Sequence, residues 1–419
     1  MNDKIKILII TYFYPPISTI GSIRTWKLVK YIRMFGYEPI VICGETDEHL
    51  WEQELPDVEV HRIKCDFLFE KVSLKIKKKV SLDESLTTFN STKDTNFQFK
   101  KFILRNLYWM LQRTKHILSE IFEYPDIYYK WRKKVLPIAS KIIESNTIVL
   151  IYSSSSPVTD HLIANYLSRK FDIPWVADYR DLWTKNHYDS VSSFKQYFEK
   201  KLELRTLSRA SLVVTVSGPA AKIQSDFLNK PVHVVTNGFD SEDYDLNVQP
   251  YEIFTIIYTG IIYSGKRDPS MLFAAVKKLM DTGKILKNKI RIKFFGAEKV
   301  LLENLLKQYD IDEVVEICDR ISLDQAIIEQ KRATVLLLLM WNHMAEKGVY
   351  TGKIFEYLGA KRPILAIPTI NGSVVDELLD KTQAGISCSS VGEVEDILLT
   401  WYQTFYCTGK LPYEGIDQE

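Results

Sequence analysis

Residues 348–360 (GVYTGKIFEYLGA) combine a helix start with a cation and a carboxylate, an arrangement that suits a nucleotide. Thr351 is expected to cap the helix, so that the N–H groups of Gly352 and Lys353 point outward towards an anion. Glu356 lies three residues after Lys353 and therefore on the same helix face. We expect a diphosphate at the helix start and ribose hydroxyls on Glu356. A surface ion pair between Lys353 and Glu356 is the alternative.

Two further loops could hold an anion. Residues 11–24 lead from an apolar run into a helix that begins near Gly21 and Ser22, although Gly21 could simply end a tight turn. Residues 259–269 carry Lys266 beside a second cation, for which a solvated Lys-Arg pair is the alternative. The sequence contains neither G-x-G-x-x-G nor G-x-x-x-x-G-K-[ST], so a dinucleotide fingerprint and a P-loop are both missing.

The segment VADYRDLW (176–183) ends a predicted strand in three alternating charges. Asp178, Arg180 and Asp181 could bind sugar hydroxyls or stabilise charge during a transfer reaction. The alternative is that Asp181 caps a helix and that Arg180 forms a local ion pair. The sequence does not indicate which of Asp178 and Arg180, if either, takes part in proton transfer.

Short apolar runs alternate with helical patterns, which predicts an α/β fold with parallel sheets. Helices are expected between the strands, including 21–36, 269–283 and 351–360. The expected strands cover residues 5–11, 38–44, 147–153, 174–178, 211–217 and 231–237, then 254–260, 290–296, 314–319, 333–340, 363–368 and 384–389. This pattern favours two Rossmann-like, doubly wound parallel-sheet domains that face each other across a cleft. Ligands of such sheets lie beyond the carboxyl ends of the strands, where the loops described above begin.

The length of 419 residues agrees with two domains, because single cores stop growing near ~250–300 residues. We expect an N-terminal domain over 1–239, an acidic linker over 240–252 and a C-terminal domain over 253–395. Residues 396–419 should form a helix and tail that could pack back on the N-terminal domain. Residues 64–125 break the alternating rhythm and are interpreted as an insertion.

The overall composition excludes several classes of protein. The 55 basic and 53 acidic residues give a net charge of +2, which argues against a uniformly basic surface that coats nucleic acid. The five cysteines include no Cys-x-x-Cys pair, which excludes a clustered zinc site and fits a reducing compartment. There is no secretory signal and no apolar stretch of the ~20 residues that span a membrane. We therefore expect a cytoplasmic protein.

Local charge singles out the interpreted insertion. Residues 62–116 contain 13 Lys or Arg against 5 Asp or Glu, a surplus of eight. Residues 97–118, which overlap this stretch, show apolar positions at helical spacing beside basic ones, a pattern that can lie on an anionic membrane surface. Residues 64–118 could thus bind the inner face of the cell membrane peripherally. A core-facing helix with a solvated basic edge is the alternative. A nucleic-acid partner is not expected, because no RNA-binding or DNA-binding motif accompanies the basic residues.

Taken together, the motifs resemble the GT-B-fold retaining glycosyltransferases of family 4, over nearly the whole chain except 64–125. YFYPPISTIGSIR (12–24) is similar to the entry loop of that family, and WVADYRDLW (175–183) to the Asp-Phe-Arg-Asp-x-Trp stretch of one branch. LVVTVSGPAA and VVTNGFD resemble the strand and the Asn-Gly-x-Asp turn that close the N-terminal domain. YTGIIYSGKRDP and GVYTGKIFEYLGAKRPILA resemble the donor-binding loops of the C-terminal domain.

The resemblance implies retaining transfer of a sugar from a nucleotide-sugar donor to a saccharide or lipid-linked saccharide acceptor, as in the synthesis of surface polysaccharides or glycoconjugates. It implies no cofactor and no metal, because cations and helix N-termini would neutralise the leaving diphosphate. Lys266 matches the family's diphosphate lysine, Glu356 the carboxylate that holds the ribose, and Gly21 the first glycine of the entry loop. The candidate catalytic residues are Asp178, Arg180 and Lys266, and the candidate donor-binding residues are Gly21, Ser22, Arg24, Lys266, Thr351, Gly352, Lys353 and Glu356.

The sequence departs from the family pattern at three positions. The first Glu of the Glu-x7-Glu motif would fall on Gly348, an Arg that often follows the first strand of the C-terminal domain is Ile261, and Ser22 replaces the second entry-loop glycine. Two other functions therefore stay open. One is a nucleotide-sugar epimerase of the same fold, and the other is a catalytically idle nucleotide-sugar-binding protein, which Gly348 favours.

Overall fold

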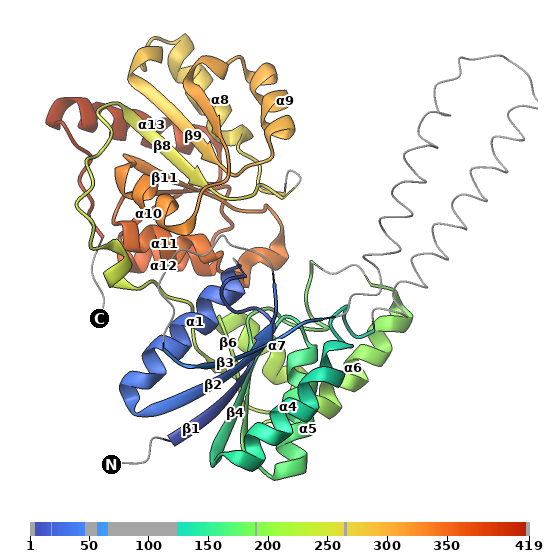
Figure 1. Cartoon of the computed structure of the whole chain (residues 1–419). Coiled ribbons are helices and arrows are strands. Elements are labelled where there is room, and N and C mark those ends of the chain that lie inside the picture. Colours follow the sequence, from blue (N-terminus) through green and yellow to red (C-terminus); the bar gives the residue numbers. More distant parts are fainter. Residues whose placement is uncertain are drawn as a thin grey trace, which may run out of the picture.

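The computed structural model describes residues 5–17, 19–46, 57–65, 124–188, 191–263 and 266–415, and these residues form two α/β domains (Figure 1). Within the described N-terminal part, seven parallel strands lie in the order β3-β2-β1-β4-β5-β6-β7. Their bounds are β1 (Ile5–Ile10), β2 (Tyr37–Gly44), β3 (Glu59–Ile63), β4 (Ile148–Ser155), β5 (Trp175–Tyr179), β6 (Leu212–Thr215) and β7 (His233–Val234). The helices of this domain are α1 (Ile20–Ile32), η1 (Arg33–Phe35), α4 (Trp131–Ser145), α5 (Thr159–Phe171), α6 (Ser193–Leu207) and α7 (Gly218–Leu228).

The C-terminal domain repeats the architecture. Its described strands are all parallel and lie in the order β10-β9-β8-β11-β12-β13. They are β8 (Phe254–Thr259), β9 (Ile290–Phe295), β10 (Val315–Cys318), β11 (Val335–Leu339), β12 (Ile364–Ile367) and β13 (Gly385–Ser387). The helical segments are η3 (Ser241–Tyr244), α8 (Ser270–Asp281), η4 (Lys287–Lys289), α9 (Lys299–Tyr309), η5 (Asp312–Val314), α10 (Leu323–Arg332), η6 (Met344–Gly348), α11 (Gly352–Ala360), α12 (Val374–Thr382) and α13 (Val391–Thr408). The predicted pair of doubly wound parallel-sheet domains is confirmed.

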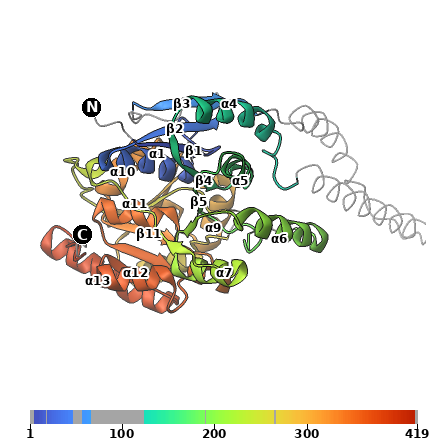
Figure 2. The same ribbon diagram turned by 90° about the horizontal axis from the view of Figure 1, so that it is seen from below.

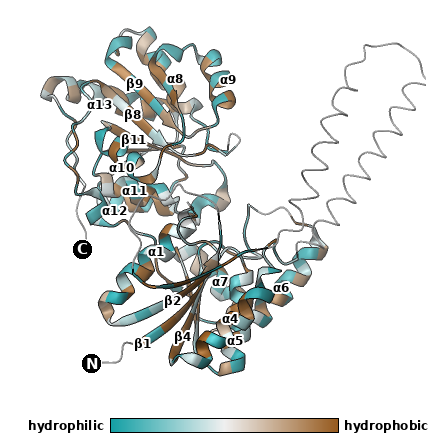
Figure 3. Ribbon diagram, in the orientation of Figure 1, coloured by the Kyte–Doolittle hydropathy of each residue, from teal (hydrophilic) through white to brown (hydrophobic). Residues whose placement is uncertain are grey.

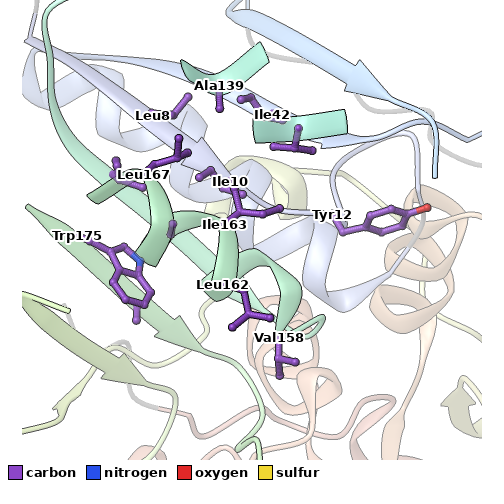
Figure 4. Close-up of a cluster of buried hydrophobic side chains, with 14 of the residues drawn as sticks. Leu8, Ile10, Tyr12, Ile42, Ala139, Val158, Leu162, Ile163, Leu167 and Trp175 are labelled. Carbon is purple, nitrogen blue, oxygen red and sulfur yellow. The ribbon is translucent and has the colours of Figure 1, made fainter. Parts of the chain in front are cut away.

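Helices cover both faces of each sheet, and for that reason the strands are continuous apolar runs. In β1, Leu8 and Ile10 belong to the core cluster on the side of α4 and α5 (Figure 4), whereas Ile7 and Ile9 belong to the cluster on the side of α1. The view turned by 90° shows α1 and α4 on opposite sides of the strands β1 to β3 (Figure 2). Hydrophobic colour accordingly concentrates on the strands, and much of the hydrophilic colour lies on the helices (Figure 3).

Each sheet has a point where the order of its strands reverses. In the first sheet β1 has β2 on one side and β4 on the other, and in the second β8 has β9 on one side and β11 on the other. Loops that leave neighbouring strands at such a point diverge and leave a crevice at their carboxyl ends. The loops after β1 and β4 and those after β8 and β11 lie at these points, and the loop after β5 leaves the neighbouring strand, which explains why the candidate residues gather there.

The residues expected to form a linker are anchored to both domains. Lys27 and Lys30 of α1 donate to Asp240 at 2.9 and 2.6 Å. Burial alone would raise the pKa of Asp240, but the hydrogen bonds from these two lysines hold it well below its usual range. Four residues later, Tyr244 packs into the core cluster of the C-terminal domain. The acidic stretch is therefore a linker that is fixed by contacts with both domains.

Two expectations need correction. The prediction omitted β3, an edge strand parallel to β2, because Glu59 and His61 interrupt its apolar pattern. The helix in 396–419 packs within the C-terminal domain instead of returning to the N-terminal domain. There Tyr402 and Phe405 of α13 pack against Phe254 of β8, with ring centroids 5.8 and 5.7 Å apart. The interpreted insertion, 64–125, lies almost entirely outside the described residues.

Candidate functional site

A cavity of about 520 Å³ lies between the two domains, at the carboxyl ends of both sheets. The N-terminal domain contributes residues from the loops after β5, β6 and β7, and the C-terminal domain contributes residues from the loops after β8 and β11. We call it the cleft cavity. Its lining residues are Arg180, Asp181, Tyr188, Val216, Asn237, Tyr263, Lys266, Arg267, Trp341, Val349, Tyr350, Thr351 and Gly352.

Cations line this cavity from both domains. Lys266 extends its Nζ over the rings of Trp341 and Tyr188, at 4.5 and 5.4 Å from their centroids. The guanidinium of Arg267 lies 4.6 Å from the ring centroid of Tyr263. Among the described residues, neither cation forms an ion pair with a carboxylate, so both remain available to an anionic ligand. Lys266 thus lies in the wall of the cleft cavity, and its role in binding a diphosphate stays a prediction.

The start of α11 faces the same cavity. Thr351 is its N-cap residue and is buried, but its hydroxyl accepts no capping hydrogen bond. The Oγ1 atom of Thr351 has no hydrogen-bond partner in the described part of the chain. The first N–H groups of a helix also lack partners within the helix. The backbone N–H groups at the start of α11, beside Gly352, and the positive end of the helix dipole therefore face the cavity.

Lys353 and Glu356 belong to α11 but do not line the cleft cavity. The Nζ of Lys353 lies 3.2 Å from the hydroxyl of Tyr258, and its side chain covers Gly260 so closely that a Cβ there would stand 2.4 Å from Cε. Burial lowers the pKa of Lys353 to about 7. Burial likewise raises the pKa of Glu356, whose carboxylate accepts a hydrogen bond from Gln330 Nε2 at 3.2 Å.

A second cavity, of about 440 Å³, adjoins the first. It shares Asn237 and Gly352 with the cleft cavity, and Glu356 lies in its wall together with apolar residues of α1. The two cavities thus meet at the start of α11.

The structure gives Arg24 and Asp178 a different place from the one predicted. Arg24 Nε and Nη2 each donate to a carboxylate oxygen of Asp178 at 2.9 Å. The remaining Arg24 donors reach the carbonyls of Val235 and Thr236 and the side chain of Asn237. All five N–H donors of the guanidinium are therefore used.

Asp178 is fully buried and also accepts hydrogen bonds from Tyr152 and Ser154, at 2.6 and 3.1 Å. Burial by itself would raise the pKa of Asp178, but the charge and hydrogen bonds of Arg24 hold it below its usual value. Arg24 and Asp178 form a structural clamp that joins α1, β5 and the chain after β7. In this arrangement neither side chain is available to bind a sugar donor or a sugar acceptor.

The entry loop also acts partly through packing. Ser22 is completely buried, and its hydroxyl lies 3.0 Å from that of Thr19, so it cannot contact a ligand. Gly21 lies under Arg180, where a Cβ would stand 1.5 Å from Nη1 of that arginine. Arg180 Nε donates to the carbonyl of Ser155 at 3.1 Å, and burial lowers the pKa of Arg180. Gly21 thus allows Arg180 to lie where it lines the cleft cavity.

Gly348 stands at a close contact between the domains. Ser217 Oγ donates to its carbonyl at 2.7 Å, and a Cβ on Gly348 would lie 2.7 Å from Cβ of Pro219. A glutamate would not fit there without a shift of the domains. Glu346 lies nearby instead, is buried, and has its Oε1 2.5 Å from Nε2 of His187 in the N-terminal domain.

Several residues of the cleft were not singled out from the sequence as ligand contacts. Trp341, Tyr188 and Tyr263 place aromatic rings around the two cations, and Asn237 joins the two cavities. The position of Trp341 just after the apolar run 333–340 is a signal that could have identified it. No comparable signal marks Tyr188, because it follows an irregular stretch of the chain.

Among the described residues, no group of three or more His, Cys, Asp and Glu side chains could hold a metal ion. None of the helices in that part of the chain combines the length and the apolar character that crossing a bilayer requires.

Comparison with known proteins finds similarity in structure only. No protein-family model matches the chain, and no curated protein sequence matches it. The solved structure of TarM superposes with a TM-score of 0.58 at 8% identity, covering 97% of this chain and 93% of that one. Sucrose-phosphate synthase from Thermosynechococcus elongatus gives 0.55 at 11% identity, covering 97% and 90%. UDP-GlcNAc 2-epimerase from Methanocaldococcus jannaschii gives 0.51 at 10% identity, covering 94% and 92%.

At these identities the similarity establishes the fold and no more. The chain has the GT-B fold of two facing Rossmann-like domains. Membership of family 4 stays a prediction from the motifs.

Proposed function

We propose that this protein is a glycosyltransferase that moves a sugar from a nucleotide-sugar donor to a saccharide acceptor. The observation that carries the proposal is the cleft cavity, in which Lys266, Arg267 and Arg180 from two domains meet the start of α11. Preorganised cations and N–H groups of this kind stabilise the negative charge that develops on a departing diphosphate. The fold supports the proposal, because both a sucrose-phosphate synthase and a UDP-GlcNAc 2-epimerase share it.

The proposed donor pose follows the two adjoining cavities. The diphosphate lies near Thr351 and Gly352, the ribose hydroxyls approach Glu356, and the sugar extends into the cleft cavity towards Arg180. Lys266 and Arg267 then neutralise the leaving group as the bond from the sugar to the diphosphate breaks. Lys353 supports this charge from beneath the loop after β8.

Retention of anomeric configuration and independence of metal belong to the proposal through the resemblance to family 4. In that scheme the acceptor hydroxyl attacks the face from which the diphosphate departs, and a phosphate oxygen of the leaving group helps to take the proton. The synthesis of surface polysaccharides or glycoconjugates is the biological setting that the resemblance suggests. The chain's own cations are positioned to replace the charge that a divalent ion would supply.

A lipid-linked acceptor at the cytoplasmic face of a membrane is the finer part of the proposal. The basic residues 64–118 that motivate it lie outside the described part of the chain, but α6 adds support. On α6, Phe194, Tyr197 and Phe198 are exposed, and Lys201 lies over the ring of Tyr197. Exposed aromatic side chains beside lysines suit the interface of an anionic bilayer.

Vesicle binding tests this membrane contact. The protein should bind phosphatidylserine-containing vesicles at low salt and release them as the salt concentration rises, because the Debye length shortens. Charge reversal at Lys100, Lys101 and Arg105 to Glu should abolish binding. Equal binding to neutral and anionic vesicles, or binding to neither, would contradict the membrane contact.

A thermal-shift screen of purified protein against UDP-, GDP-, dTDP- and CMP-sugars tests the donor site. A matched nucleotide sugar at a hundred times its Kd should stabilise the protein by about 2.7 kcal/mol. Lys266→Ala should weaken binding roughly tenfold to a hundredfold, since charge-assisted hydrogen bonds contribute about 1.5–3 kcal/mol. Lys299→Ala on the exposed face of α9 is the matched control and should change nothing.

The products decide between the candidate functions. Transfer of the sugar to an added glycoside supports the proposal, whereas a product formed from the donor alone with the sugar epimerised would favour an epimerase. Stabilisation without any turnover would indicate an idle binding protein. No stabilisation by any nucleotide sugar would refute the donor site.

A further inference from the structure

The short helix η6 of the C-terminal domain is docked on the N-terminal domain beside the cleft cavity. The carboxylate of Glu346 lies 2.5 Å from Nε2 of His187 and also accepts a hydrogen bond from the hydroxyl of Tyr188. At the end of η6, the carbonyl of Gly348 accepts a hydrogen bond from Ser217 Oγ at 2.7 Å. His187, Tyr188 and Ser217 all belong to the N-terminal domain, so η6 joins the two domains.

These contacts border the cleft cavity. Tyr188 of the N-terminal domain and Trp341 of the C-terminal domain both line it, and their ring centroids are 5.8 Å apart. The ring of His187 is stacked on that of Trp341, at 6.1 Å between centroids. Lys266 places its Nζ over the rings of both Tyr188 and Trp341. If η6 left the N-terminal domain, these two sides of the wall would separate and the cavity would open.

The domains are connected at a second place, where the linker passes from one to the other. Lys27 of α1 donates to Asp243 at 2.5 Å, which fixes this part of η3 to the N-terminal domain. At the next residue, the carbonyl of Tyr244 accepts a hydrogen bond from Lys331, and its ring lies against Gly359, where a Cβ would stand 2.5 Å from the ring. The attachment therefore changes between Asp243 and Tyr244. Hinges are often a few residues of this kind, about which two domains rotate once their other contacts are released.

The pair of His187 and Glu346 can change its strength with pH. A neutral imidazole donates one hydrogen bond to a carboxylate, whereas an imidazolium adds a Coulombic attraction to that bond. Histidine side chains change their charge between about pH 5 and 8. The side chains of Glu346 and His187 are only 3% and 23% exposed, so dissolved salt screens this pair less than a surface pair. The contact should therefore strengthen as the solution is acidified over this range.

Other charged or titratable side chains face this pair from three elements. They are Asp181 and Tyr188 after β5, Lys266 and Arg267 after β8, and His343 before η6. Lys266 and Arg267 oppose a positive charge on His187, and Asp181 favours one. The carboxylate of Glu346 is in direct contact with His187, so its attraction determines the sign of the effect.

Two of these side chains are neutral in this arrangement. Burial and the hydrogen bond to Glu346 raise the pKa of Tyr188, so its hydroxyl keeps its proton. Nδ1 of His343 accepts a hydrogen bond from the N–H of Ala345 at 3.2 Å and therefore carries no proton. The ring of His343 lies parallel to that of His187, at 6.3 Å between centroids, and a charge on it would oppose a charge on His187.

We propose that η6 is a latch that holds the two domains closed over the cleft cavity, and that protonation of His187 tightens it through Glu346. Release of η6, with rotation between Asp243 and Tyr244, opens the cavity so that a ligand can enter or leave it. Acidification shifts the population towards the closed form. The latch does not depend on the identity of the ligand and therefore goes beyond the proposed function.

Three substitutions separate the contacts of the latch. His187→Gln keeps a side-chain N–H donor for Glu346 but removes the charge that depends on pH. Glu346→Gln removes the carboxylate that attracts this charge. Ser217→Ala removes the hydrogen bond to the carbonyl of Gly348, whose two partners do not titrate, and should weaken the latch equally at every pH. His233→Gln in β7, where the histidine is exposed, is the matched control.

Single-molecule FRET on the full chain without ligand measures the closed and open populations. The dyes are attached through unnatural amino acids at two exposed positions, Lys222 on α7 and Lys381 on α12. From about pH 8 to about pH 6, the ratio of closed to open molecules should rise at least about fivefold in the parent and in His233→Gln. The ratio should change by less than about twofold in His187→Gln and in Glu346→Gln. In Ser217→Ala it should be lower at each pH but rise by the same factor as in the parent.

Several results would overturn the latch. These are a single population at every pH, a ratio that falls on acidification, a pH dependence that survives in both His187→Gln and Glu346→Gln, or one that disappears in Ser217→Ala. The titrations of the parent and of Ser217→Ala can refute the latch without the two Gln variants. Because no ligand is present, the result is independent of whether the protein transfers a sugar, and the failure of either proposal leaves the other standing.

Discussion

Replacing Asp178 by alanine should destabilise the N-terminal domain rather than remove a catalytic group. The carboxylate is fully buried and accepts two hydrogen bonds from Arg24, one from Tyr152 and one from Ser154. Without it, the Arg24 guanidinium stays in a site where only 9% of its side chain is exposed, with no opposite charge beside it. The same loss would free the chain after β7, which Arg24 holds.

The magnitude follows from this burial. Removing one partner of a buried ion pair costs about 3–5 kcal/mol, because the other charge is left uncompensated. For a domain of this size each kcal/mol lowers the melting temperature by about 2–4 °C, so the variant should melt roughly 6–20 °C below the parent. The double variant Arg24→Met/Asp178→Ala should recover part of that loss, because no isolated charge remains.

Differential scanning calorimetry and urea unfolding measure the effect. Asp172→Asn is the control, since Asp172 forms an ion pair with Arg209 but has 91% of its side chain exposed, and asparagine tolerates the left-handed backbone of this residue (φ 53°). An exposed pair of this kind contributes about 0–1 kcal/mol, so the control should melt close to the parent. The contrast between the two aspartates isolates the effect of burial.

A variant Asp178→Ala that stays stable but loses activity would refute the structural role of this residue. If Asp178→Ala lost less than about 1 kcal/mol of unfolding free energy while transfer activity fell by more than a hundredfold, Asp178 would act on the reactants. The sequence-based assignment of a catalytic role would then be preferred over the structural clamp.

Four further outcomes are expected. The pKa of Asp178 is lower in the folded protein than the ordinary carboxyl value of 3.8. The ionised carboxylate therefore stabilises the fold fully above pH 3.8, and this stabilisation is lost as the pH falls through the folded pKa. Urea unfolding at several pH values should show the unfolding free energies of the parent and of Asp178→Asn converging in acid. The pKa of Lys353 is lowered to about 7, so its amine loses its positive charge between pH 6 and 8. Calorimetry should therefore show nucleotide affinity falling more steeply over this pH range in the parent than in Lys353→Met. Equal slopes in the two proteins would contradict a role of Lys353 in anion binding. Gly348→Ala should cost about 1–3 kcal/mol through its contact with Pro219, whereas Gly392→Ala, where a Cβ meets nothing within 4 Å, should be neutral or stabilising in thermal unfolding. Transfer activity should survive EDTA, and activity lost on chelation and restored by Mn²⁺ or Mg²⁺ would overturn charge neutralisation by side chains alone.

The amino-acid sequence by itself determined the two-domain α/β architecture and most of its strands. Runs such as Ile5–Ile10 and Val335–Leu339 are apolar at every or nearly every position because helices cover both faces of a parallel sheet, and this leaves a signal that needs no partner to be recognised. The edge strand β3 was missed, because an edge faces solvent and its alternation is broken by charges. Lys266, Thr351 and Gly352 line the cleft cavity, in loops that the sequence analysis had identified, since a loop after a strand and a helix start are local features. Their roles in donor binding stay predictions.

Only the tertiary structure decided the role of residues whose partners are distant in the chain. Asp178 lies 154 positions from Arg24 in the sequence, and the residues around either one do not indicate that the two side chains form an ion pair. From the sequence, Gly348 was interpreted only as the loss of the first Glu of the Glu-x7-Glu motif. Its contact with Pro219 shows that the two domains leave no room for a side chain there. Local sequence specifies which groups are present, whereas burial and pairing, which determine their charge and their accessibility, are properties of the packed fold.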